Sequence, residues 1–408
     1  MSNRVVRAWR WWFAIPMSLR FAVGIWIALF LGVFGRVAVS KPEQQSVLPV
    51  YLYGAERLLA GELMYTRPAP PIPDVFRNPP AVAAFFVPFT HLDPKATAIL
   101  WRLLGVSLYL LGLKRLIRDV LPPLSNARRA WVWILSAVLV IPAFNNAQIN
   151  LHILATALLG TAAAARGRWW SAAVWLVVCG SCKVYTAAAG LLMSVAFPKR
   201  LAWRFAVAGL LIIGGATLAV EAWARPQSPL TEFTHALRDE DRSGAELSRA
   251  PKSWSIVVRV WFGVVVPEEV RFGVSLAVAA AMAGWVYFRA GSVSDGRDAG
   301  PSLTLPALTS PSLTLPALKL GLIWLTLFGP ATEMNTYSVL APVAGVLCVV
   351  GRWQWVARAG TLLLLVAVIR GAFPPGMAYP LHTVQAVGTA LLLVAALGYP
   401  SSPRVYER

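Results

Sequence analysis

The chain has 408 residues, of which 57% are hydrophobic and 13% are charged, and its formal net charge is +19. Soluble globular proteins average about 25% charged residues, so the composition excludes a soluble domain and predicts an integral membrane protein. The basic residues lie in short loops between apolar segments, as the positive-inside pattern of membrane proteins requires. We therefore expect no nucleic-acid partner.

Twelve apolar segments follow one another and predict an all-α polytopic integral membrane protein with about 12 transmembrane helices in a single domain, 1–408. The first segment follows Arg4, Arg7 and Arg10, and we interpret it as an uncleaved helix whose basic end lies in the cytoplasm. The expected spans are 20–36, 96–113, 131–144, 150–165, 169–182, 184–197, 203–222, 271–289, 316–329, 336–351, 356–372 and 383–399.

The charge of the connecting loops assigns the two sides of the membrane. With the N-terminus in the cytoplasm, every loop on that side carries at least two Lys or Arg residues, and the C-terminus is cytoplasmic as well. Most of the 18 acidic residues fall on the opposite face. The candidate acid–base groups are therefore expected outside the cytoplasm.

Two large extracytoplasmic loops are expected, 37–95 and 223–270. The first contains two apolar segments, 47–60 and 80–89, which we interpret as helices lying at the membrane interface. The alternative is that 80–90 crosses the membrane as a tilted span.

The loop 291–315 is expected to be a cytoplasmic insertion of low complexity. A decapeptide is repeated in this region, since Pro301–Leu308 and Pro311–Leu318 have the same eight residues. Prolines at such short intervals are expected to exclude a regular helix.

The most informative polar segment lies between the apolar stretches Trp131–Phe144 and Leu151–Ala165. This amide turn, Asn145–Asn150, carries four carboxamide side chains in six residues. Hydrogen-bonding groups are costly in a membrane unless they have partners, and carboxamides both donate and accept. The turn therefore predicts a binding element for a hydroxyl-rich ligand such as a sugar, with helix capping as the alternative.

Three charged residues interrupt apolar sequence on the same predicted face. Lys183 either reaches the interface or binds a lipid phosphate. Arg77 either pairs with Asp74 or contacts a phosphate. Glu333 either caps the following helix or acts as a base in a substrate cavity. No phosphate-binding glycine loop and no histidine pair with zinc-ligand spacing occurs, so we expect neither a metal nor a cofactor.

Several short motifs occur in a fixed order between about residues 45 and 350. They are Gly61-x-x-x-Tyr65, Phe76-x-x-Pro79-Pro80, Asn146-x-Gln148-x-Asn150, Lys183-x-Tyr185 and Pro330-Ala-Thr-Glu333-x-x-Thr336-Tyr337. With these motifs in this order, the chain resembles glycosyltransferase family 87, the polyprenyl-phosphate-sugar-dependent transferases of the GT-C superfamily. The segment Gly329–Pro342 is similar to a bacterial branch of that family.

The resemblance implies a GT-C-like enzyme of the bacterial cytoplasmic membrane whose site lies at the extracytoplasmic face. It implies a lipid-linked sugar donor, often of mannose, and inversion at the anomeric carbon. The family usually places an acidic residue just after the first helix, which here falls near Ser46 and Val47, and neither can act as a base. Glu43 and Glu333 are therefore the two candidate bases.

We expect a hexosyltransferase that moves a hexose, such as mannose, from a polyprenyl phosphate to a lipid or glycan acceptor outside the cytoplasm. The alternatives are a transporter or flippase of a lipid-linked saccharide, whose helices are also broken near its site, and a non-catalytic membrane subunit. In the expected site two cations bind the phosphate and carboxamides hold sugar hydroxyls. The substrate-binding residues are Arg77, Asn146, Gln148, Asn150, Lys183 and Tyr185.

Overall fold

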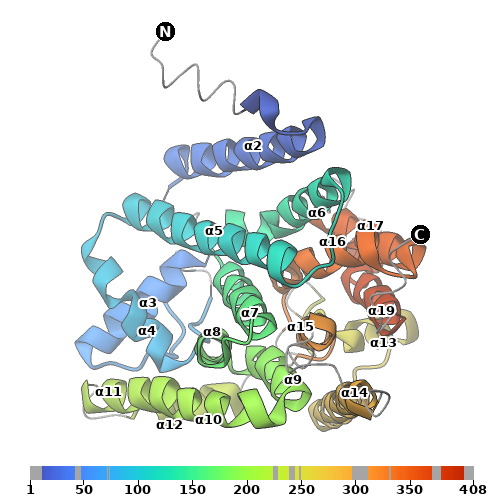
Figure 1. The fold of residues 1–408 in the computed structure, drawn as a ribbon. Helices are drawn as coiled ribbons and strands as arrows, with labels where there is room; N and C mark the ends of the chain where they lie inside the picture. Colours follow the sequence, from blue (N-terminus) through green and yellow to red (C-terminus); the bar gives the residue numbers. More distant parts are fainter. Residues whose placement is uncertain are drawn as a thin grey trace.

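The computed structural model consists of helices and connecting loops, and no strand occurs among the residues that it describes (Figure 1). These are residues 12–41, 47–70, 72, 74–223, 228–238, 244–247, 250–295, 311–329, 332–369 and 378–398. The helices up to the second large loop are α2 (Met17–Val39), α3 (Leu48–Ala60), α4 (Pro80–Phe86), η2 (Val87–His91), α5 (Pro94–Asp119), α6 (Asn126–Asn145), α7 (Asn150–Ala165), α8 (Trp169–Cys182), η3 (Val184–Ala187), α9 (Ala188–Ala196), η4 (Pro198–Ala202), α10 (Trp203–Gly209), η5 (Leu210–Gly214) and α11 (Gly215–Trp223). Those that follow are α12 (Pro229–Arg238), α13 (Trp254–Phe262), α14 (Glu268–Asp295), α15 (Pro311–Leu327), η7 (Met334–Leu340), α16 (Ala341–Val350), α17 (Gln354–Val368), α18 (Ala378–Leu381) and α19 (Val384–Leu397).

Five helices in the described ranges are long and apolar enough to cross a membrane, by length and composition. They are Met17–Val39, Pro94–Asp119, Asn126–Asn145, Pro198–Trp223 and Glu268–Ala290. The other seven predicted spans also coincide with apolar helices, but these are only 10–17 residues long. The all-α membrane fold is therefore confirmed, whereas the count of about 12 spans stays a prediction.

The interior of the molecule is built around α7, in which every residue is buried. It packs between α5 and α8. Glycines allow the close approach of α5, because a Cβ on Gly105 would lie 2.6 Å from the ring of His152, and one on Gly112 would lie 3.0 Å from the carbonyl oxygen of Ala155. Small residues at such contacts are typical of packed membrane helices. This packing fixes the start of α7, and with it the amide turn, relative to α5.

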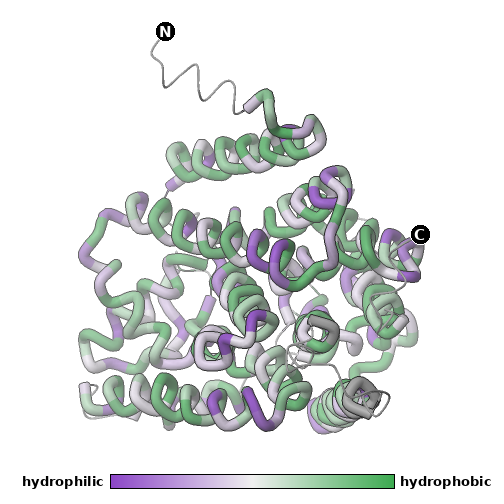
Figure 2. Tube along the Cα trace, in the orientation of Figure 1, coloured by the Kyte–Doolittle hydropathy of each residue, from purple (hydrophilic) through white to green (hydrophobic). Residues whose placement is uncertain are grey.

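Other helices expose apolar side chains instead of burying them. In the continuous helix from Pro198 to Trp223, Leu210 is 74% exposed, and in α14 Phe288 is 76% exposed. Apolar residues run along α10 and α11 at the edge of the molecule (Figure 2). Extended apolar surfaces of this kind mark contact with lipid.

The helices do not form a single parallel bundle. In Figure 1, α2, α5 and the α10–α11 rod run across the view in similar directions, whereas α14 is seen nearly along its axis. The orientation of the termini rests on the positive-inside pattern and stays a prediction.

The first predicted extracytoplasmic loop contains two packed helices, as expected, at Leu48–Ala60 and Pro80–Phe86. Tyr51 stacks on Phe86 with ring centroids 5.0 Å apart, and Phe86 meets Trp101 of α5 at 4.7 Å. Phe76 packs closely against α3 at Gly54, since a Cβ there would lie 2.8 Å from the ring of Phe76. These contacts attach the loop to the N-terminal part of α5.

The expectation that prolines exclude a helix from the repeat is wrong for its second copy. Helix α15 begins at Pro311, within the predicted loop 291–315, and contains Pro316 in its interior. Pro311 removes no helical hydrogen bond, because the first four amides of a helix have no helical partner, whereas Pro316, the sixth residue, removes one. Leu315, Ala317 and Leu318 are almost completely buried, so packing outweighs the lost bond. The first copy of the repeat lies outside the described residues.

Candidate functional site

The amide turn joins the end of α6 to the start of α7. Asn146 is the C-cap of α6, and the chain then passes through Ala147, whose φ of 53° lies in the left-handed region. Non-glycine residues adopt this conformation at a cost. Backbone bonds from Asn146 to Pro142 at 3.1 Å and from Gln148 to Ala143 at 3.0 Å close the turn.

Two adjacent side chains of α5 hold the backbone of this turn. The Arg102 guanidinium donates to the carbonyls of Phe144 at 3.1 Å, Asn145 at 2.7 Å and Ala98 at 3.1 Å. The Trp101 indole donates to the carbonyl of Ala147 at 2.9 Å. The last carbonyls of a helix have no intrahelical donor, so Arg102 supplies the donors at the end of α6.

Tyr51 of α3 supports the turn from the side of the first loop. The backbone N–H of Ile149 donates to its hydroxyl oxygen at 3.2 Å. Burial raises the pKa of Tyr51 to about 12, and the nearby Lys183 ammonium opposes this only in part. The phenol therefore stays neutral and acts as a hydrogen-bonding support.

The amide side chains form a chain of hydrogen bonds that ends at Lys183. Asn150 donates to the side-chain oxygen of Gln148, and the Lys183 ammonium donates to Asn150 Oδ1 at 3.3 Å. Gln148 is 5% exposed and Asn150 only 1%, whereas Asn146 is partly exposed. Asn146 donates to Oδ1 of Asn335 in η7 at 3.3 Å. The turn thus connects the end of α8 with the start of η7.

Lys183 lies at the point where α8 ends and η3 begins, in an extended conformation. Its ammonium is 6.0 Å from the centroid of the Tyr185 ring. Burial lowers the pKa of Lys183, but its interactions with Tyr185, Glu333 and Tyr51 outweigh burial and raise the pKa above its ordinary value. Lys183 is therefore a cation at neutral pH.

Glu333 occupies the N-cap of η7 and forms a capping box with Thr336. The capping interpretation is thus confirmed, and the same carboxylate also faces two cations. Its Oε1 lies 4.0 Å from Arg77 Nη1, and its charge acts on Lys183. Arg77 also pairs with Asp74, as the alternative interpretation expected. One guanidinium therefore lies between two carboxylates.

A second set of bonds fixes the segment around Arg77. The Asn78 side chain donates to the carbonyl of Cys182 at 2.9 Å, beside Lys183. The Tyr65 hydroxyl donates to the carbonyl of Asn78 at 2.8 Å. The two cationic residues are therefore positioned by a common link, because Asn78 follows Arg77 and Cys182 precedes Lys183.

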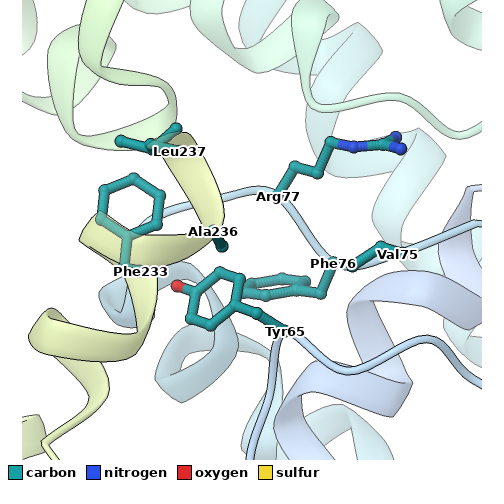
Figure 3. A pocket seen from close by; sticks show the side chains of 7 residues that line it. All are labelled: Tyr65, Val75, Phe76, Arg77, Phe233, Ala236 and Leu237. Carbon is teal, nitrogen blue, oxygen red and sulfur yellow. The ribbon is translucent and has the colours of Figure 1, made fainter. Parts of the chain in front are cut away.

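A pocket of about 240 Å³ lies beside Arg77, between the first loop and α12 (Figure 3). Its lining residues are Tyr65, Val75, Phe76, Arg77, Phe233, Ala236 and Leu237. The stem of Arg77 borders the pocket, and its guanidinium points away from Phe233 and Tyr65 (Figure 3). Arg77 thus joins an apolar pocket to the polar cluster.

The structure brings most of the residues predicted from sequence into one region. Arg77, Glu333, Lys183 and the amide turn form a connected cluster, and Tyr185 lies against Lys183. Glu43 lies outside the described residues. Within the described ranges, no group of three or more His, Cys, Asp or Glu side chains is arranged to hold a metal ion.

Sequence reasoning missed the residues that hold the cluster in place, namely Tyr51, Trp101, Arg102 and Asn335. A signal was present for Arg102, because an arginine inside the apolar segment 96–113 must find partners in the protein. No local pattern identifies Tyr51 or Asn335, because their partners are distant in the sequence.

A family model, glycosyltransferase family 87, matches residues 76–315. This is more than half of the chain, and it includes Arg77, the amide turn and Lys183 but neither Glu43 nor Glu333. No curated protein and no solved structure gives a match. The chain belongs to glycosyltransferase family 87 and is a membrane glycosyltransferase.

Proposed function

We propose that this protein transfers a hexose, such as mannose, from a polyprenyl phosphate to a lipid or glycan hydroxyl outside the cytoplasm, with inversion at the anomeric carbon. The observation that carries the proposal is the cluster of Arg77, Lys183 and Glu333 beside the amide turn. Two cations suit a phosphate leaving group, and a carboxylate suits deprotonation of a hydroxyl.

In the proposed reaction, the acceptor oxygen attacks the anomeric carbon as the bond from that carbon to the phosphate oxygen breaks. The bonding electron pair leaves with the phosphate, and its charge is stabilised by Arg77 and Lys183. The hydroxyl proton passes to a carboxylate, for which Glu333 and Glu43 are the candidates. The products are the new glycoside and a polyprenyl phosphate, and inversion follows from this single displacement.

Burial divides the amide side chains between two proposed roles. Asn146 is partly exposed, so we assign it to the sugar hydroxyls. Gln148 and Asn150 are almost fully buried and hydrogen-bonded to each other, and Asn150 accepts from Lys183. Their carboxamides therefore hold the ammonium in the direction of the phosphate, and any contact of theirs with the sugar requires local opening of the turn.

The test is sugar transfer by the purified protein in proteoliposomes, with a radiolabelled polyprenyl-phosphate mannose as donor and an alkyl mannoside as acceptor. A transferase forms labelled disaccharide and free polyprenyl phosphate. A flippase moves the labelled donor between leaflets and forms no new glycosidic bond. Arg77→Met should abolish product formation, while Arg128→Met, at an exposed position remote from the cluster, should leave it unchanged. Donor movement without product would contradict the proposal.

A further inference from the structure

We propose that the pocket between α12 and the Tyr65–Arg77 segment binds the phosphate-proximal isoprene units of a polyprenyl phosphate, with the phosphate at Arg77. This inference rests on the proposed function, because it concerns how the lipid donor is held. It assigns the pocket to the hydrocarbon chain, and not to the sugar or to the acceptor.

The lining of the pocket favours a hydrocarbon. Three aromatic rings border it, and Tyr65 lies 5.5 Å from Phe76 and 5.6 Å from Phe233 between ring centroids. The side chains of Val75, Ala236 and Leu237 add further apolar surface. The Tyr65 hydroxyl already donates to the carbonyl of Asn78. A sugar placed here would lose hydrogen bonds to water and gain few in return.

The guanidinium at the edge of the pocket can bind an anionic head group in exchange for one of its two carboxylate partners, Asp74 and Glu333. The stem of Arg77 lines the pocket while its guanidinium points out of it (Figure 3), toward Asp74 and Glu333. A chain in the pocket would thus place its phosphate at the guanidinium. Because Glu333 Oε1 is 4.0 Å from Arg77 Nη1, the bond to be broken would lie near the proposed base.

The pocket is connected to surface that faces lipid. Helix α12 contacts α11, whose Leu218 is 72% exposed, and Leu237 both lines the pocket and is 47% exposed. The remaining isoprene units can therefore leave the pocket across apolar surface. A soluble sugar phosphate would gain nothing from this route.

One carboxylate fixes α12 as the outer wall of the pocket. Glu232 accepts hydrogen bonds from the backbone N–H groups of Met64 at 3.1 Å and Tyr65 at 2.8 Å. Hydrogen bonds to a charged acceptor are stronger than those between neutral groups. The wall is thus attached to the segment that carries Tyr65, and Phe233 lies one residue further along the helix.

The direct test is photocrosslinking with a polyprenyl phosphate that carries a diazirine in its first isoprene unit. Labelled peptides should contain Tyr65–Arg77 and α12, and labelling should be reduced by farnesyl phosphate but not by equal concentrations of inorganic phosphate. Labelling confined to other helices would overturn the proposal. Competition by inorganic phosphate as strong as that by farnesyl phosphate would also overturn it, since the chain would then add no affinity.

A matched pair of variants tests the same pocket by kinetics. Ala236→Trp fills the pocket and should raise the KM for the polyprenyl donor about tenfold or more, with a smaller effect on kcat. His235→Trp, at the adjacent exposed position of α12, should not change KM. Equal KM values for the two variants would overturn the proposal.

The two proposals fail separately. If the wild-type protein forms no glycoside but the probe labels the pocket, the transfer proposal fails and the lipid site stands. If transfer occurs and the probe labels other segments, the pocket assignment alone is wrong.

Discussion

At the scale of single residues, the site depends on a lysine that is held in place before any ligand arrives. Lys183 donates to Asn150, which is itself bonded to Gln148. Its interactions with Tyr185, Glu333 and Tyr51 raise its pKa, so the ammonium is present at neutral pH. Both its charge and its position therefore suit a phosphate.

Lys183→Met should weaken binding of the donor. A hydrogen bond to a charged group contributes about 1.5–3 kcal/mol, so we expect the KM for the polyprenyl-phosphate donor to rise about 10- to 100-fold. Lys199→Met, at an exposed position beyond α9, is the control and should leave KM unchanged. Steady-state kinetics of both variants measure the difference, and an unchanged KM for Lys183→Met would exclude a phosphate contact.

The sequence predicted the polar residues of the site well. It did not predict their hydrogen-bond partners. The amide turn, Lys183 and Glu333 are visible because each interrupts apolar sequence. Their partners are not visible, because Asn146 contacts Asn335 and Asn78 contacts Cys182 only after the chain has folded. The burial of Gln148 and Asn150 was also not predictable from the sequence. A carboxamide at a turn is equally compatible with solvent and with the interior.

At the scale of helices, α5 determines the shape of the turn. Arg102 is almost fully buried and supplies donors to the carbonyls of Phe144 and Asn145, while Trp101 supplies one to Ala147. The left-handed conformation of Ala147 persists because these bonds fix the carbonyls on both sides of it. The helix thus acts on the site through the backbone, without a side chain in the proposed chemistry.

Arg102→Met should destabilise the protein and disturb the turn. Each buried carbonyl that loses its donor costs about 1–3 kcal/mol, so we expect a clear decrease in the thermal unfolding temperature in detergent. Lys114→Met, at an exposed position of the same helix, should have little effect. Equal unfolding temperatures for the two variants would show that water or other donors replace the guanidinium.

The helices themselves were predicted well from apolar segments, and the exceptions have physical causes. Each of the twelve predicted segments contains a helix within its described residues, because long apolar stretches in a membrane protein have few other ways to pair their backbone groups. The second decapeptide copy is an exception, because the burial of its apolar side chains stabilises α15 despite its prolines. Loop packing, such as the attachment of α12 by Glu232, depends on contacts between distant segments.

At the scale of the whole molecule, the site lies where the first loop, the starts of α7 and η7 and the end of α8 meet. Apolar helices with exposed surfaces, notably α10–α11, lie at the edge (Figure 2). The topology predicted from the sequence places the cluster on the outer side of the cytoplasmic membrane. A lipid-linked donor would then reach it from the outer leaflet.

Cysteine labelling in intact cells tests this orientation. Glu62→Cys, in the first loop, should react with a membrane-impermeant maleimide without permeabilisation. Arg128→Cys, in the first turn of α6, should react only after permeabilisation. Both positions are exposed, so access to the reagent depends on the side of the membrane. The opposite pattern would place the site in the cytoplasm.

The central claim is that a carboxylate of this chain deprotonates the acceptor at the cluster of Arg77 and Lys183. The most direct measurement is the transfer rate from a labelled polyprenyl-phosphate mannose by Glu333→Gln, Glu43→Gln and the double variant. Glutamine at position 333 retains an acceptor for the capping box, so the fold should be preserved. Loss of the base in one single variant should lower kcat about 10²- to 10⁴-fold. Transfer at the wild-type rate by the double variant would contradict the account.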